Sequence, residues 1–247
     1  MNAIETTGLT KRFRGRTAVE DLNLAIAQGE FFALLGQNGA GKTTTIRMLT
    51  CLLAPSAGDA LLMGESISRN AEAAKAHSNL SPQETAIAQN LTVRENLMLI
   101  ARLYGANKAD AAGRAEAAMR EFGLSARARD RAKTLSGGMQ RRLSIAMALI
   151  TKPNVLFLDE PTLGLDVRAR RELWKTISAL KGKVTVVLTT HYLEEAEALA
   201  DRIGIMHEGR LQALGTAAAL CAETNTTNFE DAFLTLTESE SEKEAAL

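Results

Sequence analysis

The sequence predicts an α/β fold in which a mainly parallel β-sheet is covered by helices on both faces. A dense apolar run, FFALL at 31–35, is typical of a central parallel strand that is buried on both sides. From residue 154 onward, short apolar runs alternate with segments of helical spacing, and this alternation favours parallel strands joined by helices. The chain has 247 residues, which is enough to bury a substantial core.

The composition is that of an ordinary globular protein and excludes several function classes. Hydrophobic residues make up 46% and charged residues 23% of the chain, so bulk disorder is excluded. The 29 basic and 29 acidic residues balance, whereas a protein that binds nucleic acid or membranes through general charge is strongly basic. The two cysteines, Cys51 and Cys221, lie far apart without a CxxC or histidine cluster. This pattern excludes a zinc site or a disulfide scaffold and fits a reducing compartment.

No segment of the sequence has the pattern of a membrane span or an export signal. The longest apolar runs are much shorter than the roughly 20 residues that cross a bilayer. The first residues, MNAIETTGLTKRF, contain no apolar core ahead of a cleavage site. We therefore expect a cytoplasmic chain, and the balanced charge leads us to expect no nucleic-acid partner.

The first half of the chain contains a strand–loop–helix unit. Residues 22–26 place an apolar residue at every second position, which predicts a half-buried strand. Residues 31–53 predict a buried strand, a glycine-rich loop and then a helix with apolar positions at Ile46, Leu49 and Leu53. This unit is therefore expected to carry a loop at the carboxyl end of a central strand.

Residues 90–150 differ in character from the segments on either side. They are rich in Ala, Leu, Arg and Glu and predict successive helices, which we expect to end near Gly105, Gly113 and Gly123. Because the block lies between two strand-like regions, it is a candidate helical insertion.

The second half returns to alternating strands and helices. Strands are predicted at 155–160, 184–190 and 202–206, and helices at 168–180 and 192–200. The sequence HEGR indicates a hairpin turn into a further strand, LQALG. Near the end, NFEDAFLTL predicts a docked helix, with one apolar stripe formed by Phe229, Ala232, Phe233 and Leu236. The acidic residues that follow have little to bury, so we expect them to fray.

A glycine-rich loop between the buried strand and the following helix predicts a phosphate-binding site. Residues 36–43 match the pattern GxxxxGK[ST], in which glycines let backbone N–H groups surround phosphate oxygens. Lys42 is expected to reach the β- and γ-phosphates, and Thr43 to place its hydroxyl on Mg²⁺. The predicted nucleotide-binding residues of this segment are Gly36, Asn38, Gly39, Ala40, Gly41, Lys42, Thr43 and Thr44.

Two carboxylates, Asp159 and Glu160, follow the apolar strand predicted at 155–160. The carboxyl ends of parallel strands are where ligands bind in open α/β sheets. We expect Asp159 to hold the magnesium shell, directly or through water, and Glu160 to orient and deprotonate the attacking water.

Further strings resemble the nucleotide-binding subunit of ABC transporters. In chain order they are the phosphate loop, Gln83 in SPQE, the string LSGGMQ that begins at Leu135, the acid pair, Asp166 in LGLD, and His191 after VTVVLTT. The resemblance covers nearly the whole chain, and the LSGG string is highly specific to this superfamily.

The resemblance implies a P-loop NTPase fold with a RecA-like parallel sheet core, an N-terminal antiparallel β region and an inserted α-helical subdomain. It implies an ABC-type ATP-binding domain over residues 4–232, with the helical subdomain at about residues 84–150. Residues 233–247 are then expected to form an acidic, disordered tail.

The resemblance also implies roles for residues outside the phosphate loop. In this family two copies form a head-to-tail dimer, and the signature of one copy closes over the ATP held by the other. The signature and dimer residues implied for this chain are Ser136, Gly137, Gly138, Gln140 and Asp166. His191 is implied to stabilise the γ-phosphate and water, Gln83 to sense the metal and water, and Phe13 to stack on adenine.

Within the superfamily, LTVRENL at 91–97, THYLEEAEALADRI at 190–203 and the NFEDAFLTLT segment resemble ABC-2-type exporter ATPases. The resemblance implies a homodimeric ATPase, with ATP and Mg²⁺ as cofactors, that powers export through a separate ABC-2-type membrane permease. Such a subunit lies peripherally on the inner face of the cell membrane, and the permease is expected to dock near residues 84–104.

Two alternatives involve other classes of protein. A soluble ABC-family ATPase that acts on ribosomes or DNA typically carries two cassettes, a long coiled coil or zinc insertions, and the sequence contains none of these. A small-molecule kinase uses a phosphate loop but has no use for an LSGG string. A membrane protein encoded beside this chain would favour the exporter.

Overall fold

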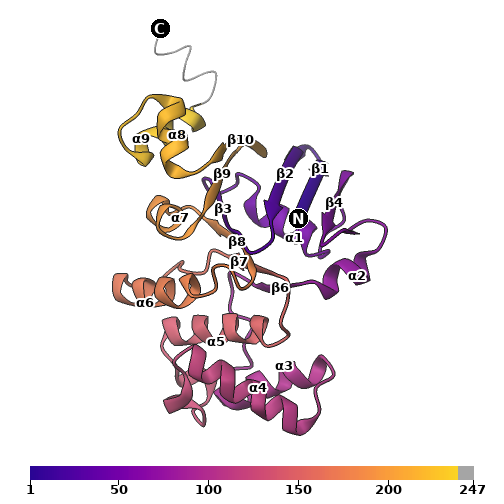
Figure 1. Cartoon of the computed structure of the whole chain (residues 1–247), viewed down its shortest axis with the longest axis vertical. Helices are drawn as coiled ribbons and strands as arrows, with labels where there is room; N and C mark the ends of the chain where they lie inside the picture. The colour runs from indigo at the N-terminus through magenta and orange to yellow at the C-terminus, as the bar shows by residue number, and fades with distance from the viewer. Residues whose placement is uncertain (239–247) are drawn as a thin grey trace.

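The computed structural model describes residues 1–238, which form two β-sheets with helices packed around them (Figure 1). The larger sheet has six strands. In spatial order they are β10 (Arg210–Gly215), β9 (Arg202–His207), β3 (Phe31–Leu35), β8 (Thr185–Thr190), β7 (Val155–Asp159) and β6 (Ser78–Ser81). All neighbouring pairs from β9 to β6 are parallel, and only β10 runs antiparallel to its neighbour. The predicted α/β fold with a mainly parallel sheet is confirmed.

Strand β3 is the centre of this sheet and is buried along its whole length. Phe31, Ala33 and Leu35 pack into the core beneath the helices of the second half of the chain. Phe32 and Leu34 point to the opposite face and pack against the N-terminal sheet and α1 (Lys42–Leu49). Because successive side chains of a strand point to opposite faces, the unbroken apolar run FFALL fills both cores.

The smaller sheet is antiparallel and is formed mostly by the N-terminal residues. Its spatial order is β2 (Arg16–Ala27), β1 (Asn2–Phe13), β4 (Ala57–Leu62) and β5 (Glu65–Ser66). Leu22, Leu24 and Ile26 of β2 are buried, while the residues between them are exposed, so the alternation predicted there is confirmed. Helix α2 (Ala71–Ala76) then leads from this sheet into β6.

The block between β6 and β7 is helical and lies at the lower end of the molecule in Figure 1. It contains α3 (Val93–Leu103), α4 (Lys108–Glu121), α5 (Gly137–Leu149) and two short 3₁₀ turns, Ser125–Arg127 and Ala132–Thr134. Gly105 and Gly123 follow the ends of α3 and α4 and have positive φ angles, as expected for residues that stop a helix. The predicted stop at Gly113 is wrong, because this glycine lies inside α4 and one glycine does not end a helix whose neighbours favour it.

Helix α1 is also shorter than predicted. The spacing of Ile46, Leu49 and Leu53 led us to expect a helix as far as residue 53, but α1 ends at Leu49. Cys51 adopts a left-handed backbone with φ 55°, so the chain leaves the helix before Leu53.

The last helices cover the face of the large sheet opposite the smaller sheet. They are α6 (Val167–Ser178), α7 (Leu193–Leu199), α8 (Ala217–Thr224) and α9 (Phe229–Thr237). Phe229, Ala232 and Phe233 of α9 are buried in the same core as Phe31, so the apolar stripe predicted to dock does so on this chain's own core. The domain boundary predicted between 232 and 233 falls inside α9, and the rest of the predicted tail, 239–247, lies outside the described residues.

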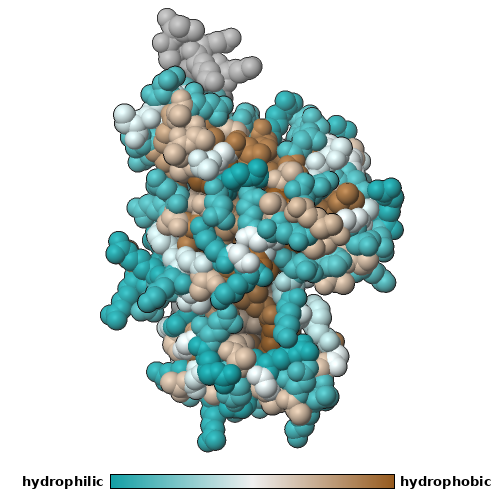
Figure 2. Space-filling model, viewed as in Figure 1, coloured by the Kyte–Doolittle hydropathy of each residue, from teal (hydrophilic) through white to brown (hydrophobic). Residues whose placement is uncertain are grey.

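No helix among residues 1–238 is both long enough and apolar enough to span a membrane. Figure 2, drawn from the same side as Figure 1, shows a largely hydrophilic outer rim with apolar residues gathered along the middle of the molecule.

Candidate functional site

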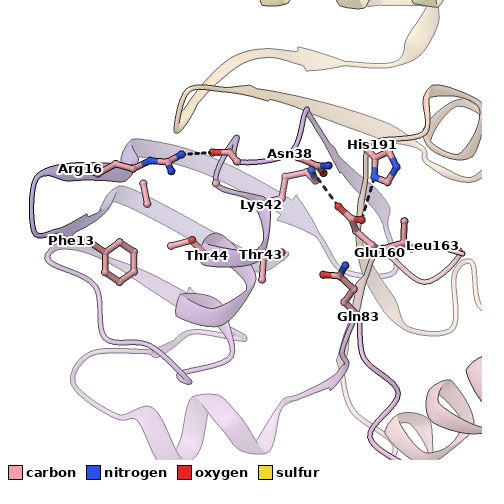
Figure 3. A pocket seen from close by; sticks show the side chains of 13 residues that line it. Phe13, Arg16, Asn38, Lys42, Thr43, Thr44, Gln83, Glu160, Leu163 and His191 are labelled. Carbon is pink, nitrogen blue, oxygen red and sulfur yellow. Dashed lines mark hydrogen bonds and ion pairs between the residues drawn. The ribbon is translucent and has the colours of Figure 1, made fainter.

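A pocket of about 480 Å³ lies beside the carboxyl ends of β3, β7 and β8 (Figure 3). Three loops that are far apart in the sequence meet there because their strands are neighbours in the parallel sheet. Ten of the predicted site residues line the pocket: Phe13, Asn38, Gly39, Gly41, Lys42, Thr43, Thr44, Gln83, Glu160 and His191. Arg16, Ala18 and Leu163 complete its lining.

The loop after β3 can adopt its tight path only because of its glycines. A Cβ atom on Gly36 would lie 2.3 Å from the Met206 carbonyl oxygen. Gly41 has φ +104°, and a Cβ atom there would lie 2.4 Å from the Ala18 carbonyl oxygen. The backbone of this loop therefore passes too close to its neighbours for any other residue, and it leads directly into the amino end of α1. Free N–H groups at that end favour an anion.

Lys42 is the buried cation of the pocket, with only 4% of its surface exposed. Its Nζ atom donates hydrogen bonds to the carbonyl oxygens of Gly36 at 2.8 Å and Gln37 at 3.1 Å. It also lies 3.5 Å from Oε1 of Glu160, which comes from the end of β7. Burial lowers the pKa of the Lys42 ammonium, and the carboxylates of Glu160 and Asp159 oppose that change.

Glu160 stands between Lys42 and His191. Its Oε2 atom lies 3.2 Å from Nδ1 of His191, so the two carboxylate oxygens contact different partners. Its backbone has φ 45°, a left-handed conformation that is uncommon for a residue with a long side chain. The Glu160 N–H group donates to both the carbonyl and the hydroxyl oxygen of Thr189 at 3.1 Å, which holds this backbone in place. A residue held in such a conformation is typical of an active site.

Asp159 and Thr43 present oxygen atoms side by side next to the pocket. The Thr43 hydroxyl donates to Oδ1 of Asp159 at 3.2 Å, and the Thr189 hydroxyl donates to the same oxygen at 2.5 Å. Hydroxyl and carboxylate oxygens are the donors that Mg²⁺ prefers, and Mg²⁺ often keeps several waters and takes only one or two protein ligands beside substrate phosphates. The donor set therefore fits Mg²⁺, although the described residues contain no group of three or more His, Cys, Asp or Glu side chains placed to hold a metal.

Gln83 reaches the pocket from the segment after β6, and its backbone is fixed by a residue of α5. Arg141 is buried, with 5% exposed surface, and its guanidinium donates to the carbonyl oxygens of Pro82 at 2.6 Å and Gln83 at 2.5 Å. Burial lowers the pKa of the Arg141 guanidinium, and the charges of Asp159 and Glu195 oppose that change. The helix that begins within the LSGG string is thus tied directly to the segment that carries Gln83.

Phe13 lies at the far end of the pocket from Glu160, at the tip of the β1–β2 hairpin (Figure 3). Its ring is 49% exposed and is not part of the core. A half-exposed aromatic ring beside a phosphate loop is a suitable surface for a nucleotide base.

Several predicted residues lie outside this pocket. Ser136, Gly137 and Asp166 are exposed. The Ser136 hydroxyl caps α5 by accepting from the Met139 N–H, and the Asp166 carboxylate caps α6 by accepting from the Ala169 N–H. The predicted residues that do not line the pocket are Gly36, Ala40, Ser136, Gly137, Gly138, Gln140, Asp159 and Asp166.

The structure also gives Gln140 a contact within this chain. Its amide nitrogen donates to the carbonyl oxygens of Ala132 at 3.2 Å and Leu135 at 3.3 Å. This side chain therefore fixes the turn that leads into the LSGG string.

The sequence patterns do not identify Arg16, Thr189 or Arg141 as site residues. Arg16 reaches the pocket only because the hairpin pairs it with Phe13. Thr189 is the first of two threonines just before His191. The signal in the sequence was a hydroxyl two positions before a predicted site residue, at the end of a central strand. Arg141 donates to backbone carbonyl oxygens 58 and 59 positions away in the sequence, and no sequence pattern predicts contacts of this kind.

Comparisons with known proteins show which family this chain is similar to. A family profile described as "ABC transporter" matches residues 19–163. The daunorubicin resistance ATP-binding protein DrrA3 of Streptomyces coeruleorubidus is 45% identical over 223 residues, which are 90% of this chain and 71% of that protein. The Nod factor export ATP-binding protein I of Paraburkholderia xenovorans is 44% identical over 89% of this chain and 73% of that protein. A solved structure described as the ATP-binding subunit of an ABC transporter has a TM-score of 0.84 and 30% identity, over 96% of this chain and all of that one.

Proposed function

The chain belongs to the family of ABC transporter ATP-binding subunits, and from this premise we propose how its residues bind and hydrolyse ATP to power export. The proposal rests on the two contacts of the Glu160 carboxylate beside the loop of residues 36–43. Its Oε1 atom lies 3.5 Å from Nζ of Lys42, and its Oε2 atom lies 3.2 Å from Nδ1 of His191. A buried cation can neutralise phosphate charge, and a carboxylate beside an imidazole can orient and deprotonate an attacking water.

The nucleotide is bound along the pocket from Phe13 to Glu160. Adenine stacks on Phe13, the N–H groups of the loop contact the phosphate oxygens, and Lys42 neutralises charge on the β- and γ-phosphates. Thr43 and Asp159, with Gln83, are the proposed ligands of Mg²⁺, directly or through water. The metal would neutralise the charge that develops on the phosphate oxygens.

Glu160 acts as the general base. It takes a proton from a water molecule, whose oxygen attacks the γ-phosphorus while the bond to the bridging oxygen breaks and ADP leaves. His191 contacts Oε2 of Glu160, which orients the carboxylate, and it stabilises the γ-phosphate. The left-handed backbone at Glu160 turns its side chain from the sheet edge toward Lys42.

We propose that the second half of each ATP site comes from another copy of the chain. Ser136, Gly137 and Asp166 are exposed and do not line the pocket that holds Lys42. Leu163 and Val167, which flank Asp166, are large apolar residues that are 36% and 63% exposed. An exposed helix amino end beside apolar side chains supports a two-fold dimer in which Ser136 of one copy contacts ATP bound to the other.

The permease partner is proposed to be of the ABC-2 type, with this subunit cytoplasmic and held at the inner face of the cell membrane. The similarity to ATP-binding proteins named for drug resistance and Nod factor export supports export as the direction. Helix α3 supports docking near residues 84–104, because Leu99 and Leu103 are 41% and 70% exposed beside an apolar groove. Exposed apolar residues gathered on one surface are typical of a protein interface.

Changing Glu160 to Gln tests the proposed chemistry. The amide cannot accept the proton of water, so we expect turnover to fall by about 10²–10⁴ while ATP still binds. The bound ATP then remains intact, and we expect the dimer to stay closed in size-exclusion chromatography with ATP. Lys42→Ala is the control, because it should weaken nucleotide binding itself. Normal hydrolysis by the Glu160→Gln chain would remove Glu160 from its proposed role.

A further inference from the structure

We propose that Arg16 is a further nucleotide-binding residue, whose guanidinium contacts the phosphate groups nearest the ribose. This inference rests on the proposed ATP site and extends it to a residue outside every motif of the sequence. Arg16 lines the same pocket as Phe13, Lys42 and Glu160. In Figure 3 it extends from the hairpin above Phe13 toward the loop that contains Asn38.

The β1–β2 hairpin places Arg16 beside Phe13. The two residues are paired across the antiparallel strands, and Gly15, with φ +77°, forms the turn between them. Residues that are directly paired on adjacent strands have Cβ atoms about 5 Å apart. A base that stacks on Phe13 therefore has the Arg16 side chain next to it, on the side of the phosphate loop.

A hydrogen bond fixes the direction of the Arg16 side chain. Its Nη2 atom donates to the carbonyl oxygen of Gly39 at 3.0 Å. Gly39 belongs to the phosphate loop, so the guanidinium joins the hairpin that carries Phe13 to the loop that surrounds the phosphates. An arginine guanidinium has five N–H donors in a planar fork, and a single bond to Gly39 leaves most of them for an anion.

The charges around the pocket make Arg16 different from Lys42. Arg16 and Lys42 are the two arginine or lysine side chains that line the pocket. The Lys42 ammonium is already paired with the Glu160 carboxylate at 3.5 Å. Arg16 makes no ion pair with any carboxylate in residues 1–238 and bonds only to a neutral carbonyl. Its positive charge therefore has no ion-pair partner among these residues and lies beside a site proposed for a polyanion, where a charge-assisted hydrogen bond to phosphate is strong.

The position of Arg16 also predicts which phosphates it contacts. It lies near Phe13 and Gly39, whereas Lys42, Glu160 and His191 gather at the other end of the pocket (Figure 3). The terminal phosphate belongs at that other end, beside the proposed base. Arg16 should therefore contribute equally to the binding of ADP and ATP.

The test compares Arg16→Gln with Arg14→Gln in the full chain. Arg14 is also exposed and lies in the turn of the same hairpin, but it does not line the pocket. Dissociation constants for ADP and ATP are measured by calorimetry at low and high salt. We expect the Arg16→Gln chain to bind both nucleotides about tenfold more weakly, as for the loss of one charge-assisted hydrogen bond. The Arg14→Gln chain should bind within about twofold of the wild type.

The salt dependence separates a phosphate contact from a purely structural tie to Gly39. Salt screens a contact between charges but has little effect on a bond to a neutral carbonyl. We therefore expect ADP binding to depend less on salt in Arg16→Gln than in the wild type. An unchanged salt dependence, an equal loss in both variants, or a loss confined to ATP would overturn the proposal. A wild-type chain that binds neither nucleotide would instead overturn the proposed function.

Discussion

Glu195 is a fully buried carboxyl group next to the site, although it does not line the pocket. It belongs to α7, and its Oε1 atom accepts a hydrogen bond at 2.9 Å from Nε1 of Trp174 on α6. Burial raises the pKa of the Glu195 carboxyl, and the hydrogen bond from Trp174 only partly opposes the rise. This contact joins α7, which follows His191 in the chain, to α6, which follows Glu160.

The raised pKa predicts how the stability of the protein depends on pH. An acid whose pKa is raised on folding holds its proton more tightly in the native state. The stability that Glu195 contributes is therefore complete below its ordinary value of 4.5 and is lost as pH rises through the raised folded value. Glu195→Gln cannot ionise, so its melting temperature relative to the wild type should increase by a few degrees between about pH 5 and pH 8. Thermal unfolding at a series of pH values measures this.

Glu194→Gln is the matched control for that measurement. Glu194 is the preceding residue of α7 and is exposed, so its difference from the wild type should stay constant over the same pH range. A constant difference for Glu195→Gln as well would show that Glu195 does not titrate as its burial implies.

At the residue scale, the sequence identifies those site residues that belong to a recognisable local motif. Lys42 and Thr43 begin the helix that follows one buried strand, Glu160 directly follows another, and the carboxyl ends of parallel strands meet at one edge of the sheet. Arg16, Arg141 and Thr189 depend on pairing between distant segments. Their contacts follow from the register of the folded sheet and the packing of α5, which no single segment specifies.

At the scale of elements, α9 shows how a terminal helix is held by its apolar stripe. Its contacts are with α7, α8, β9 and β10, and Phe233 is 8% exposed. Phe233→Ala should lower the free energy of unfolding by about 3 kcal/mol, because it leaves a cavity in the core. Leu234, the next residue, is 53% exposed, so Leu234→Ala should change stability by less than about 0.5 kcal/mol. Urea unfolding of both variants measures the difference, and equal effects would show that α9 is not docked through this stripe.

The sequence predicts well those elements whose buried residues follow a regular pattern along the chain. Strand β3 is apolar throughout because both faces are covered, and β2 alternates because only one face is. No range could be assigned to β1, β4 or β6 from sequence, since their polar residues and glycines hide the alternation. Gly113 has the residue type of a helix stop but lies inside α4, whose interior a single glycine does not interrupt.

At the scale of the whole molecule, the proposed permease determines where the protein is found. The described helices contain no membrane span, whereas α3 presents the exposed apolar side chains of Leu99 and Leu103. We expect the chain to appear in the membrane fraction only when its permease partner is produced in the same cells. Fractionation followed by immunoblotting measures this, and Leu103→Glu should reduce the recovery. Equal recovery in the membrane fraction without that partner would contradict the proposed assembly.

The placement of Ser136 on an exposed helix end, apart from the pocket of its own chain, has a genetic consequence. Two gene copies, one intact and one encoding the Glu160→Gln chain, would produce subunits that combine at random, and only about one quarter of the assemblies would contain two intact subunits. Such an allele would be dominant over its wild-type counterpart. A substitution at fully buried Ile4 that prevents folding would remove only its own product and would be recessive.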